Sequence, residues 1–469
     1  MSFKQPDAAD IAFFKSIFPE DRILTDEEHI LRCASDHTED FCFRPDIVLQ
    51  PESVEQVSAV MRHCHGQGIA VTPRGAGTGL SGGALPIHGG ISLDMRRMNR
   101  ILNIDTRNFQ VTTEPGVVTQ ELQEAVKEKG LFYPPDPASK GSCFIGGNVA
   151  ENSGGPKAVK YGVVKDYVLN LEVVLPNGEV MWTGANVLKN STGYNLTQLI
   201  TGSEGTLAVI TKIVLRLIPH PQHDVLMLVP FRSAEDACAA VNQIFLAGHT
   251  PSALEFMERD ALEWSMRFTQ NAAVTLPDDI VAHLLIEVDG NDPEQLVQDM
   301  AQIAEIVSRF DIAEPLFAES HEQKQALWAL RRKVGEAVKS HSVYKEEDTV
   351  VPRAELPELL RTVKRIGAQY GFKSVCYGHA GDGNLHVNII RGDLSEQDWN
   401  EKLPLGIREL FREVVRLGGT ISGEHGIGLV QKGYMDIAFS KAQLQLMRDI
   451  KAVFDPNGIL NPGKIFNAA

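Results

Sequence analysis

A glycine-rich loop that cannot open a helix constrains the fold of this chain more than any other feature. The loop reads Pro73-Arg-Gly-Ala-Gly-Thr-Gly-Leu-Ser-Gly-Gly83 and follows a short apolar run that predicts a strand. Gly77-Thr-Gly-Leu-Ser-Gly82 matches G-x-G-x-x-G, but a dinucleotide-binding βαβ loop must open a helix that receives the pyrophosphate. Ala84-Leu-Pro86 does not start one. We therefore predict a nest of backbone N–H groups around a diphosphate, with Arg74 and Ser81 nearby. A flexible turn without a ligand is the alternative.

Two further stretches of small residues support a large flat ligand. Pro134–Asn148 is rich in glycine, serine and proline, and Asn152-Ser-Gly-Gly155 follows it closely. Thr201-Gly-Ser-Glu-Gly-Thr206 is a third glycine-rich turn. Small side chains let the backbone approach a flat ligand closely, and asparagine and serine offer it hydrogen bonds.

The stretch His379-Ala-Gly-Asp-Gly-Asn-Leu-His386 indicates where chemistry takes place. Strand-like residues flank it on both sides, and Asp382-Gly-Asn384 is a strong hairpin signal. A hairpin would bring His379 and His386 together and would place Asn388 on the same face as His386. Neutral imidazole is a common metal ligand, so the pair predicts a divalent metal site. A hydrogen-bonded histidine pair without a metal is the alternative.

Composition and charge exclude several classes of protein. The length of 469 residues allows about three domains. The formal net charge of −16 argues against a broad nucleic-acid-binding face. The six cysteines form no C-x-x-C pair, which argues against an iron–sulfur cluster and fits a reducing compartment. The chain lacks a signal-peptide pattern and an apolar run of 18 residues, so we expect a cytoplasmic protein, with peripheral association to the inner membrane left open.

The pattern of predicted helices and strands changes at Pro219-His-Pro221, which suggests a domain boundary. Before it, strand and helix signals surround the glycine loops. After it, strands at 225–229 and 283–288 alternate with helices at 233–247, 293–310 and 322–339, and amphipathic helices are expected at 406–417 and 441–454. We predict a first domain over residues 1–220, a second over 221–403, and a C-terminal helical segment over 404–469 that packs on the first.

Together, these motifs and their order resemble the flavoprotein family of vanillyl-alcohol oxidase and para-cresol methylhydroxylase. The likeness covers nearly the whole chain and is greatest to the D-2-hydroxy-acid dehydrogenase branch, which includes D-lactate dehydrogenases, glycolate oxidase flavin subunits and D-2-hydroxyglutarate dehydrogenases. It rests on the loops above, on Gly423-Glu-His-Gly426 and on Gly458-Ile-Leu-Asn-Pro-Gly463. It implies an α+β fold with a two-part FAD-binding domain of the para-cresol methylhydroxylase type and a substrate (cap) domain built on an antiparallel sheet.

The resemblance also implies where FAD binds. Family members with covalent FAD carry a histidine in the first loop, and this loop has none, so FAD is expected to bind non-covalently. The residues expected to contact FAD are Pro73, Arg74, Gly75, Ala76, Gly77, Thr78, Gly79, Ser81, Gly82, Pro135, Asp136, Gly141, Ser142, Gly146, Gly147, Asn148, Asn152, Ser153, Gly154, Glu204, Gly205, Ile210 and Asn461.

The metal and the base are expected from two short motifs. His379, His386 and Glu424 would supply two imidazoles and a carboxylate and leave coordination positions for substrate. Zn²⁺ and Mn²⁺ both suit that set, and Fe²⁺ is a further option. The resemblance makes Glu424 the ligand and His425 the general base, and the reverse assignment is the alternative.

Substrate contacts are expected from three more residues. Arg331 resembles the family's carboxylate-binding arginine, and a guanidinium binds a carboxylate with two parallel hydrogen bonds. Lys345 resembles another substrate-site residue, although the spacing after it differs slightly from the family pattern. Asn388 is expected to bond the substrate or a ligand, or to be an ordinary polar residue of a strand. Gly335 stands where relatives that use 2-hydroxyglutarate often have a hydroxyl residue, which favours a smaller acid, whereas Lys189–Gly205 resembles the hydroxyglutarate enzymes at least as closely.

The leading hypothesis is an FAD- and metal-dependent dehydrogenase that passes the C2 hydride of D-lactate, glycolate or D-2-hydroxyglutarate to N5 of the flavin. The alternative is the flavin subunit of a multi-subunit glycolate oxidase. A non-catalytic metal- or flavin-binding protein is a third hypothesis. Because the chain has no cluster motif, electrons must leave to a separate acceptor such as a quinone, an electron-transfer flavoprotein or a cytochrome, and a homodimer is compatible with the sequence.

Overall fold

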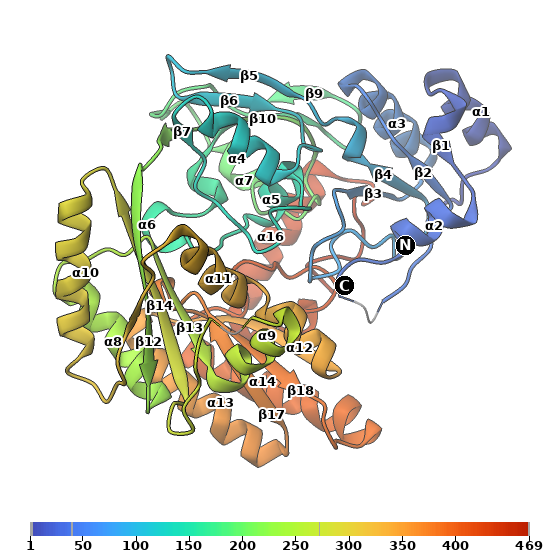
Figure 1. Ribbon diagram of the computed structural model, residues 1–469. Coiled ribbons are helices and arrows are strands. Elements are labelled where there is room, and N and C mark those ends of the chain that lie inside the picture. The colour runs from blue at the N-terminus through green and yellow to red at the C-terminus, as the bar shows by residue number, and fades with distance from the viewer. Residues whose placement is uncertain (1–2, 39–40, 272, 468–469) are drawn as a thin grey trace. The chain divides into compact units, whose positions relative to one another are not determined.

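The computed structural model describes residues 3–38, 41–271 and 273–467, in two units (Figure 1). The first unit comprises Met1–Ser153, Val163–His220 and Glu424–Ala469, and the second comprises Gly154–Gly162 and Pro221–Gly423. The chain therefore passes from one unit to the other four times. The long stretch of the second unit begins at Pro221.

A small, mostly parallel sheet in the first unit leads into the first glycine loop. Its strand order is β1 (Ile23–Leu24), β2 (Ile47–Leu49), β4 (Ile91–Asp94), β3 (Val71–Arg74), with β4 parallel to both β2 and β3. α3 (Val54–Gln67) connects β2 to β3. Its N-cap is Ser53, whose side chain accepts the Gln56 N–H, and it ends at Gly68, whose φ is 69°.

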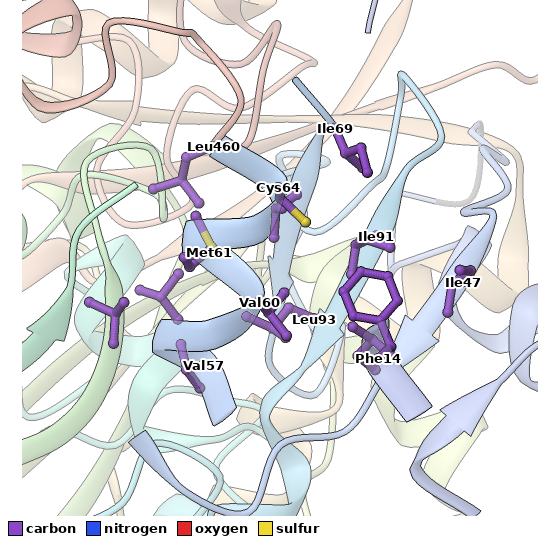
Figure 2. Close-up of a cluster of buried hydrophobic side chains, with 14 of the residues drawn as sticks. Phe14, Ile47, Val57, Val60, Met61, Cys64, Ile69, Ile91, Leu93 and Leu460 are labelled. Atoms are coloured by element: carbon purple, nitrogen blue, oxygen red, sulfur yellow. The ribbon is translucent and has the colours of Figure 1, made fainter. Parts of the chain in front are cut away.

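The core beside this sheet is built from distant parts of the chain. α3 places Val57, Val60, Met61 and Cys64 on its inner face, and α1 (Ala8–Ile17) contributes Phe14 (Figure 2). Leu460 joins the same cluster, and β3 forms a parallel bridge with it at Val71. The C-terminal tail is thus packed into the first unit by apolar contacts. The family resemblance implied such packing of the C-terminal segment on the FAD-binding domain.

A second sheet of the first unit is antiparallel throughout. Its order is β5 (Ile101–Asp105), β6 (Gln110–Thr113), β10 (Val209–Arg216), β8 (Val168–Val174), β9 (Val180–Trp182). Helices occur in the connections between its strands, and β7 (Leu131–Phe132) and β11 (Ile218–Pro219) form a separate two-stranded sheet. The remaining elements of this unit are α2 (Glu27–Ala34), α4 (Thr119–Lys127), α5 (Ile145–Glu151), α7 (Leu196–Ile200), α15 (Met435–Ala438) and α16 (Lys441–Phe454).

The second unit is built on one seven-stranded antiparallel sheet. The strand order is β15 (Leu316–Phe317), β12 (His223–Phe231), β14 (Ala282–Gly290), β13 (Ala253–Glu258), β17 (Lys373–Gly378), β18 (Asn384–Ile390), β16 (Tyr344–Val350). Strands far apart in sequence are neighbours here, since β13 pairs with β17 and β16 forms the edge beside β18. The predicted antiparallel sheet of the substrate domain is confirmed.

Helices cover both faces of this sheet (Figure 1). One face carries α8 (Ala234–Leu246), α10 (Pro293–Val307), α13 (Leu356–Tyr370) and α14 (Leu403–Arg416). The other carries α9 (Arg259–Thr269), α11 (His321–Arg332) and α12 (Val334–His341), which pack on Met257, Val375 and Tyr377 of the strands. The short helix α6 (Ala158–Tyr161) also belongs to this unit.

Two details differ from the predicted arrangement. Helix α14 belongs to the second unit, because it packs on α13, where Glu409 accepts the Tyr370 hydroxyl at 2.9 Å, so the boundary falls after Gly423 rather than after residue 403. The predicted helix over 322–339 is two helices, broken at Lys333 with φ −95° and ψ 3°. Within the described residues, no helix has both the length and the apolar character that crossing a bilayer requires.

Candidate active site

A β-hairpin brings the two histidines of the central motif together. β17 pairs antiparallel with β18, with Tyr377 opposite His386, and one turn of 3-10 helix at residues 380–382 closes the hairpin. Gly383 follows with a φ of 86°, at a point where a side chain would overlap neighbouring backbone. The rings of His379 and His386 have centroids 5.5 Å apart and planes at 81° to each other. The predicted hairpin and the proximity of the two rings are confirmed.

A buried carboxylate orients His379. Both oxygens of Glu255, which has no exposed side-chain surface, lie 2.9 Å from His379 Nδ1. The same carboxylate pairs with Arg331, whose Nη2 lies 2.6 Å from Glu255 Oε2. A carboxylate on one ring nitrogen fixes the tautomer and raises the basicity of the other nitrogen, as is usual for metal-binding histidines. Glu255 therefore makes Nε2 of His379 the nitrogen suited to a ligand.

His386 lies beside two acidic residues of the edge strand β16. Its Nδ1 is 3.2 Å from Glu346 Oε1 and 3.8 Å from Asp348 Oδ1. Asp348 is directly opposite His386 in the register, and Glu346 is opposite Asn388, so all four side chains leave the same face of the sheet. Acidic neighbours favour a bound cation at this face.

Asn388 is fully buried on that face, two residues beyond His386. Neither its Oδ1 nor its Nδ2 makes a hydrogen bond with normal geometry among the described residues. Tyr377 is also buried there. The pKa of its phenol is raised well above the usual value, mainly by burial and secondly by the negative charge of Glu346. A buried amide whose hydrogen bonds are incomplete costs free energy, which a bound polar molecule would offset.

Lys345 does not join this group. It lies opposite Ile389 in the register, and its side chain therefore leaves the other face of the sheet. There its Nζ lies 5.5 Å from the centre of the Trp399 ring. The structure places Glu346 on the histidine face instead, because neighbouring residues of a strand alternate between faces.

Arg331 is the arginine of its helix that turns inward. It is 95% buried, whereas Arg332 is half-buried over the Trp328 ring and Lys333 is exposed. The guanidinium of Arg331 lies 5.1 Å from the centre of the Tyr377 ring, and its Nε has no hydrogen-bond partner among the described residues. A Cβ at Gly335 would lie 3.1 Å from the Tyr377 hydroxyl, so this site leaves little room for a larger residue at that position.

Glu424 and His425 begin the last segment of the first unit, in a tightly held loop. Gly426 and Gly428 both have positive φ, 82° and 48°, and a side chain at Gly428 would overlap Ser81. The carboxylate of Glu204 accepts the N–H groups of Ile427 at 2.9 Å and Gly428 at 2.6 Å. Glu204 thus holds the loop that carries the predicted ligand and base.

The two long glycine loops lie against each other in the first unit. A Cβ at Gly75 would be 3.8 Å from the backbone of Gly147. No helix follows the first loop before β4, so the rejection of a dinucleotide-binding βαβ unit is confirmed. Arg74 lies against the first loop, because a Cβ at Gly77 would overlap its guanidinium, and it donates to the carbonyls of Arg32 at 3.1 Å and Ser35 at 2.8 Å. It therefore links the first loop to the N-terminal segment.

The C-terminal tail closes over the same loops. Asn461, with a φ of 42°, donates from Nδ2 to the carbonyls of Gly83 and Glu204, both at 2.9 Å. Lys464 donates to the carbonyls of Gly82 at 2.7 Å and Leu85 at 2.6 Å, and burial lowers its pKa to about 7. The Lys464 side chain therefore ties together two backbone carbonyls at the end of the first loop.

Comparison with known proteins identifies the family. Residues 45–184 match a model described as an FAD binding domain, and residues 220–465 match one described as the C-terminal domain of FAD linked oxidases. The chain belongs to the family of FAD-linked oxidases. The resemblance seen in the sequence is thereby confirmed, and with it the expectation of an FAD-dependent oxidoreductase.

Relatives of this oxidase cover almost its whole length. It is 40% identical to D-lactate dehydrogenase of Anaerostipes hadrus (90% of each chain) and 38% identical to glycolate oxidase subunit GlcD of Bacillus subtilis (92% of this chain, 91% of the relative). It is 34% identical to D-2-hydroxyglutarate dehydrogenase of Stutzerimonas stutzeri (98% of this chain, all of the relative). Substrate-bound p-cresol methylhydroxylase shares the fold, with a TM-score of 0.80 over 97% of this chain and 96% of that one at 18% identity.

The loops of this FAD-linked oxidase fit the cofactor of the family. Ser81 Oγ, Tyr133 OH, Glu151 Oε2 and Asn461 Oδ1 are buried and have no hydrogen-bond partner among the described residues. A Cβ at Gly79 or Gly147 would meet nothing within 4 Å, so both loops present open backbone. Orphaned polar atoms beside bare backbone are what a large, polar, flat cofactor would satisfy.

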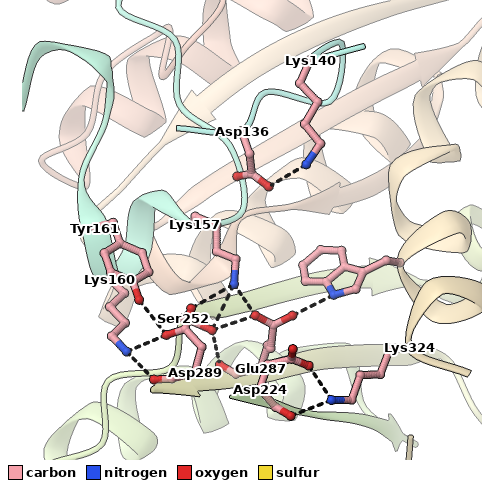
Figure 3. Close-up of polar contacts among 11 residues, drawn as sticks. Asp136, Lys140, Lys157, Lys160, Tyr161, Asp224, Ser252, Glu287, Asp289 and Lys324 are labelled. Carbon is pink, nitrogen blue, oxygen red and sulfur yellow. Dashed lines mark hydrogen bonds and ion pairs between the residues drawn. The ribbon is translucent and has the colours of Figure 1, made fainter. Parts of the chain in front are cut away.

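The other predicted cofactor residues lie in the same loops and strands. Asp136 is buried, and its Oδ2 lies 3.9 Å from Lys140 Nζ (Figure 3). Asn152 has a left-handed backbone conformation with a φ of 56°, and its Oδ1 accepts the Lys165 N–H at 2.8 Å. The rest stand in the first loop, in the second loop and α5, just after α5, in the turn over residues 201–206, or at the start of β10: Pro73, Ala76, Gly77, Thr78, Gly82, Pro135, Gly141, Ser142, Gly146, Asn148, Ser153, Gly154, Gly205 and Ile210.

Four residues of these sites escaped the sequence reasoning. Glu255, Glu346, Asp348 and Lys464 have no motif of their own. A lone glutamate inside the apolar strand of residues 253–257 was the one available signal, because an acidic residue in a fully buried strand needs a partner. The partners of Glu255 lie on other elements, so the local sequence could not identify them.

Proposed function

We propose that this oxidase converts a D-2-hydroxy acid to the 2-oxo acid, with a divalent metal held by His379, His386 and Glu424. The observation that carries the proposal is the arrangement on one face of the cap sheet. Two imidazoles, one of them oriented by Glu255, stand beside the orphaned amide of Asn388. The relatives named for D-lactate, glycolate and D-2-hydroxyglutarate support the substrate class.

The roles of the protein groups follow from their chemistry. FAD would accept the hydride from C2, and the metal would act as a Lewis acid on the substrate hydroxyl. The guanidinium of Arg331, held by Glu255, would bind the carboxylate, and Asn388 would bond a substrate oxygen. His425 would take the hydroxyl proton, since imidazole is the side chain that most often acts as a general base.

Substrate identity is best tested by anaerobic bleaching of the flavin. D-lactate, L-lactate, glycolate, malate and D-2-hydroxyglutarate are each mixed with the oxidised holoenzyme, and the absorbance of the flavin is followed. We expect a D-2-hydroxy acid, or the achiral glycolate, to bleach the flavin and L-lactate to leave it oxidised. If no 2-hydroxy acid bleaches it, the proposed reaction is wrong.

The metal is tested separately from the flavin. Chelation should abolish turnover while the flavin stays bound, and Zn²⁺ or Mn²⁺ should restore it. His379→Ala and His386→Ala should lose the metal measured by elemental analysis, whereas His223→Ala, at an exposed strand end, should keep it. Full metal content in both active-site variants would exclude these ligands.

Replacing His425 by alanine separates an enzyme from a binding protein. We expect the variant to keep its flavin and metal and to lose turnover, because the proton has no acceptor. Unchanged turnover would refute the assignment of His425 as base and leave the reverse assignment, with Glu424 as base, to be tested in the same way.

A second candidate function is the flavin subunit of a multi-subunit glycolate oxidase. The 38% identity to glycolate oxidase subunit GlcD favours it, as does the absence of a cysteine motif for a cluster in the sequence. In either case electrons leave to a separate acceptor, of the quinone, electron-transfer flavoprotein or cytochrome class. Steady turnover of the isolated chain with an artificial dye acceptor would show that it needs no partner subunit for the oxidation.

A further inference from the structure

A second buried carboxylate holds the helix that carries Arg331. Trp328 precedes Arg331 by three residues on α11, and its Nε1 donates to Glu287 Oε2 at 2.8 Å. Trp328 and Glu287 are 94% and 95% buried. Residues three apart on a helix lie about 60° apart around its axis, so the indole and the guanidinium leave neighbouring parts of one face.

A lysine and a serine hold Glu287 from its other side. Lys157 forms an ion pair with Glu287 Oε1, and Ser252 Oγ donates to the same oxygen at 2.9 Å (Figure 3). Lys157 Nζ also lies 3.3 Å from Asp289 Oδ2. A buried carboxylate with an adjacent ammonium accepts a stronger hydrogen bond than a neutral oxygen does.

Lys157 is itself held in place by its own short segment, residues 154–162. Lys160 Nζ lies 2.6 Å from Asp289 Oδ1, and the Tyr161 hydroxyl donates to the same oxygen at 2.8 Å. The segment is inserted between two stretches of the first unit but belongs to the second. Its two lysines and its tyrosine therefore anchor it on β14, the strand that carries Glu287 and Asp289 (Figure 3).

Arg331 has one described ion-pair partner, Glu255, and α11 ends one residue later. The last turn of α11 is itself held, because Ser265 Oγ donates to the Leu330 carbonyl at 2.6 Å and the Lys333 N–H donates to the Ala329 and Arg331 carbonyls. The Trp328–Glu287 bond adds the polar contact that joins this turn to strand β14. A small rotation of α11 would swing the long guanidinium away from its place beside Glu255 and Tyr377.

We infer that Lys157, Glu287 and Trp328 are positioning residues for Arg331, acting through α11. The inference rests on the proposed function, in which Arg331 binds the substrate carboxylate. It assigns the three residues no contact with substrate, and so predicts that their loss weakens substrate binding more than it slows the chemical step.

Two substitutions that keep most of the side-chain volume test the inference in the holoenzyme. Trp328→Phe removes the indole N–H, and Glu287→Gln removes the charge. We expect each to raise KM for the 2-hydroxy acid about 3- to 10-fold, less than the full worth of the bond because the bond acts on substrate only through Arg331, with kcat within about 2-fold and flavin content unchanged. Lys324→Ala is the matched control on α11, where it breaks an exposed ion pair with Asp224, and it should leave KM unchanged.

The combination with Arg331→Lys distinguishes positioning from general stability. If Trp328 acts through Arg331, then Trp328→Phe should raise KM little further once Arg331 is replaced by lysine. Additive effects, or an unchanged KM in both Trp328→Phe and Glu287→Gln while Arg331→Lys raises it, would overturn the positioning role. An unchanged KM in Arg331→Lys alone would instead refute the proposed substrate role of Arg331.

Discussion

Replacing Glu255 by glutamine tests the link between the core of the second unit and the proposed metal. The carboxylate joins Arg331 at 2.6 Å and His379 at 2.9 Å, and it has no exposed surface. Glutamine keeps the volume and one acceptor oxygen. Its NH₂ group must then face either the guanidinium or the imidazole N–H, so one of two buried donors loses its partner.

The expected loss of stability follows from these contacts. Removing one member of a buried ion pair costs about 3–5 kcal/mol, because the other charge stays buried and unpaired. The oxygen of the new amide would restore about 1 kcal/mol through one neutral hydrogen bond. We therefore expect the free energy of unfolding to fall by about 2–4 kcal/mol. Metal affinity should fall about 10- to 100-fold, the usual effect of removing the carboxylate behind a ligating histidine.

The change in the free energy of unfolding and the change in metal affinity of Glu255→Gln are measured separately. Urea unfolding of the metal-free protein reports stability, and calorimetric titration with Zn²⁺ reports affinity. Glu258→Gln is the matched control, since Glu258 lies at the end of the same strand, pairs with Lys364 at 2.7 Å and leaves the opposite face. It should lose stability and keep its Zn²⁺ affinity. Equal Zn²⁺ affinity in both variants would show that Glu255 does not orient a metal ligand.

Three further predictions concern pH and backbone. His283 is buried, and burial lowers its pKa to about 4, so between about pH 6.5 and 4 the unfolded chain binds a proton that the folded chain does not. The free energy of unfolding therefore decreases as the pH is lowered, by about 2 kcal/mol between about pH 8 and pH 5. In His283→Leu this decrease should be absent when stability is measured by urea unfolding at both pH values. Gly383→Ala should cost about 2–4 kcal/mol in thermal unfolding, since its Cβ overlaps backbone at positive φ, whereas Gly371→Ala, also at positive φ but in open space, should cost about 1 kcal/mol. Gly426→Ala should lower kcat at least about 10-fold by shifting the loop of His425, with Gly433→Ala, in open space, as control.

Local chemistry was enough to predict the elements of this oxidase that depend on neighbours in sequence. The turn residues at 382–384 specified the hairpin, and Pro86 excluded a helix after the first glycine loop. Helix α16 begins at Lys441 and ends at Phe454, as its apolar spacing indicated. In each case a few adjacent residues restrict the backbone strongly enough to decide its conformation.

Contacts between distant strands could not be predicted in this way. The pairing of β16 with β18 decides that Glu346 and Asp348, rather than Lys345, face His386. A shift of one residue in that register would reverse every side chain of the strand, and the sequence of β16 is polar on both faces, so it carries no pattern that selects a face. The same reasoning applies to α14, whose apolar stripe shows that it packs without showing on which unit.

The buried charges of this protein explain why its active-site residues were easier to find than the residues that support them. His379 and His386 stand in a turn that the sequence marks, but Glu255 and Glu287 are single acidic residues in apolar strands. Their partners His379, Trp328 and Lys157 lie 41 to 130 positions away along the chain and reach them only once the sheet has formed. Each ion pair costs desolvation that its Coulomb attraction offsets only with good geometry, so such pairs are weak evidence for stability alone. Both carboxylates here contact α11, one through Arg331 and one through Trp328, so the position of one helix explains these buried charges better than the stability of the core does.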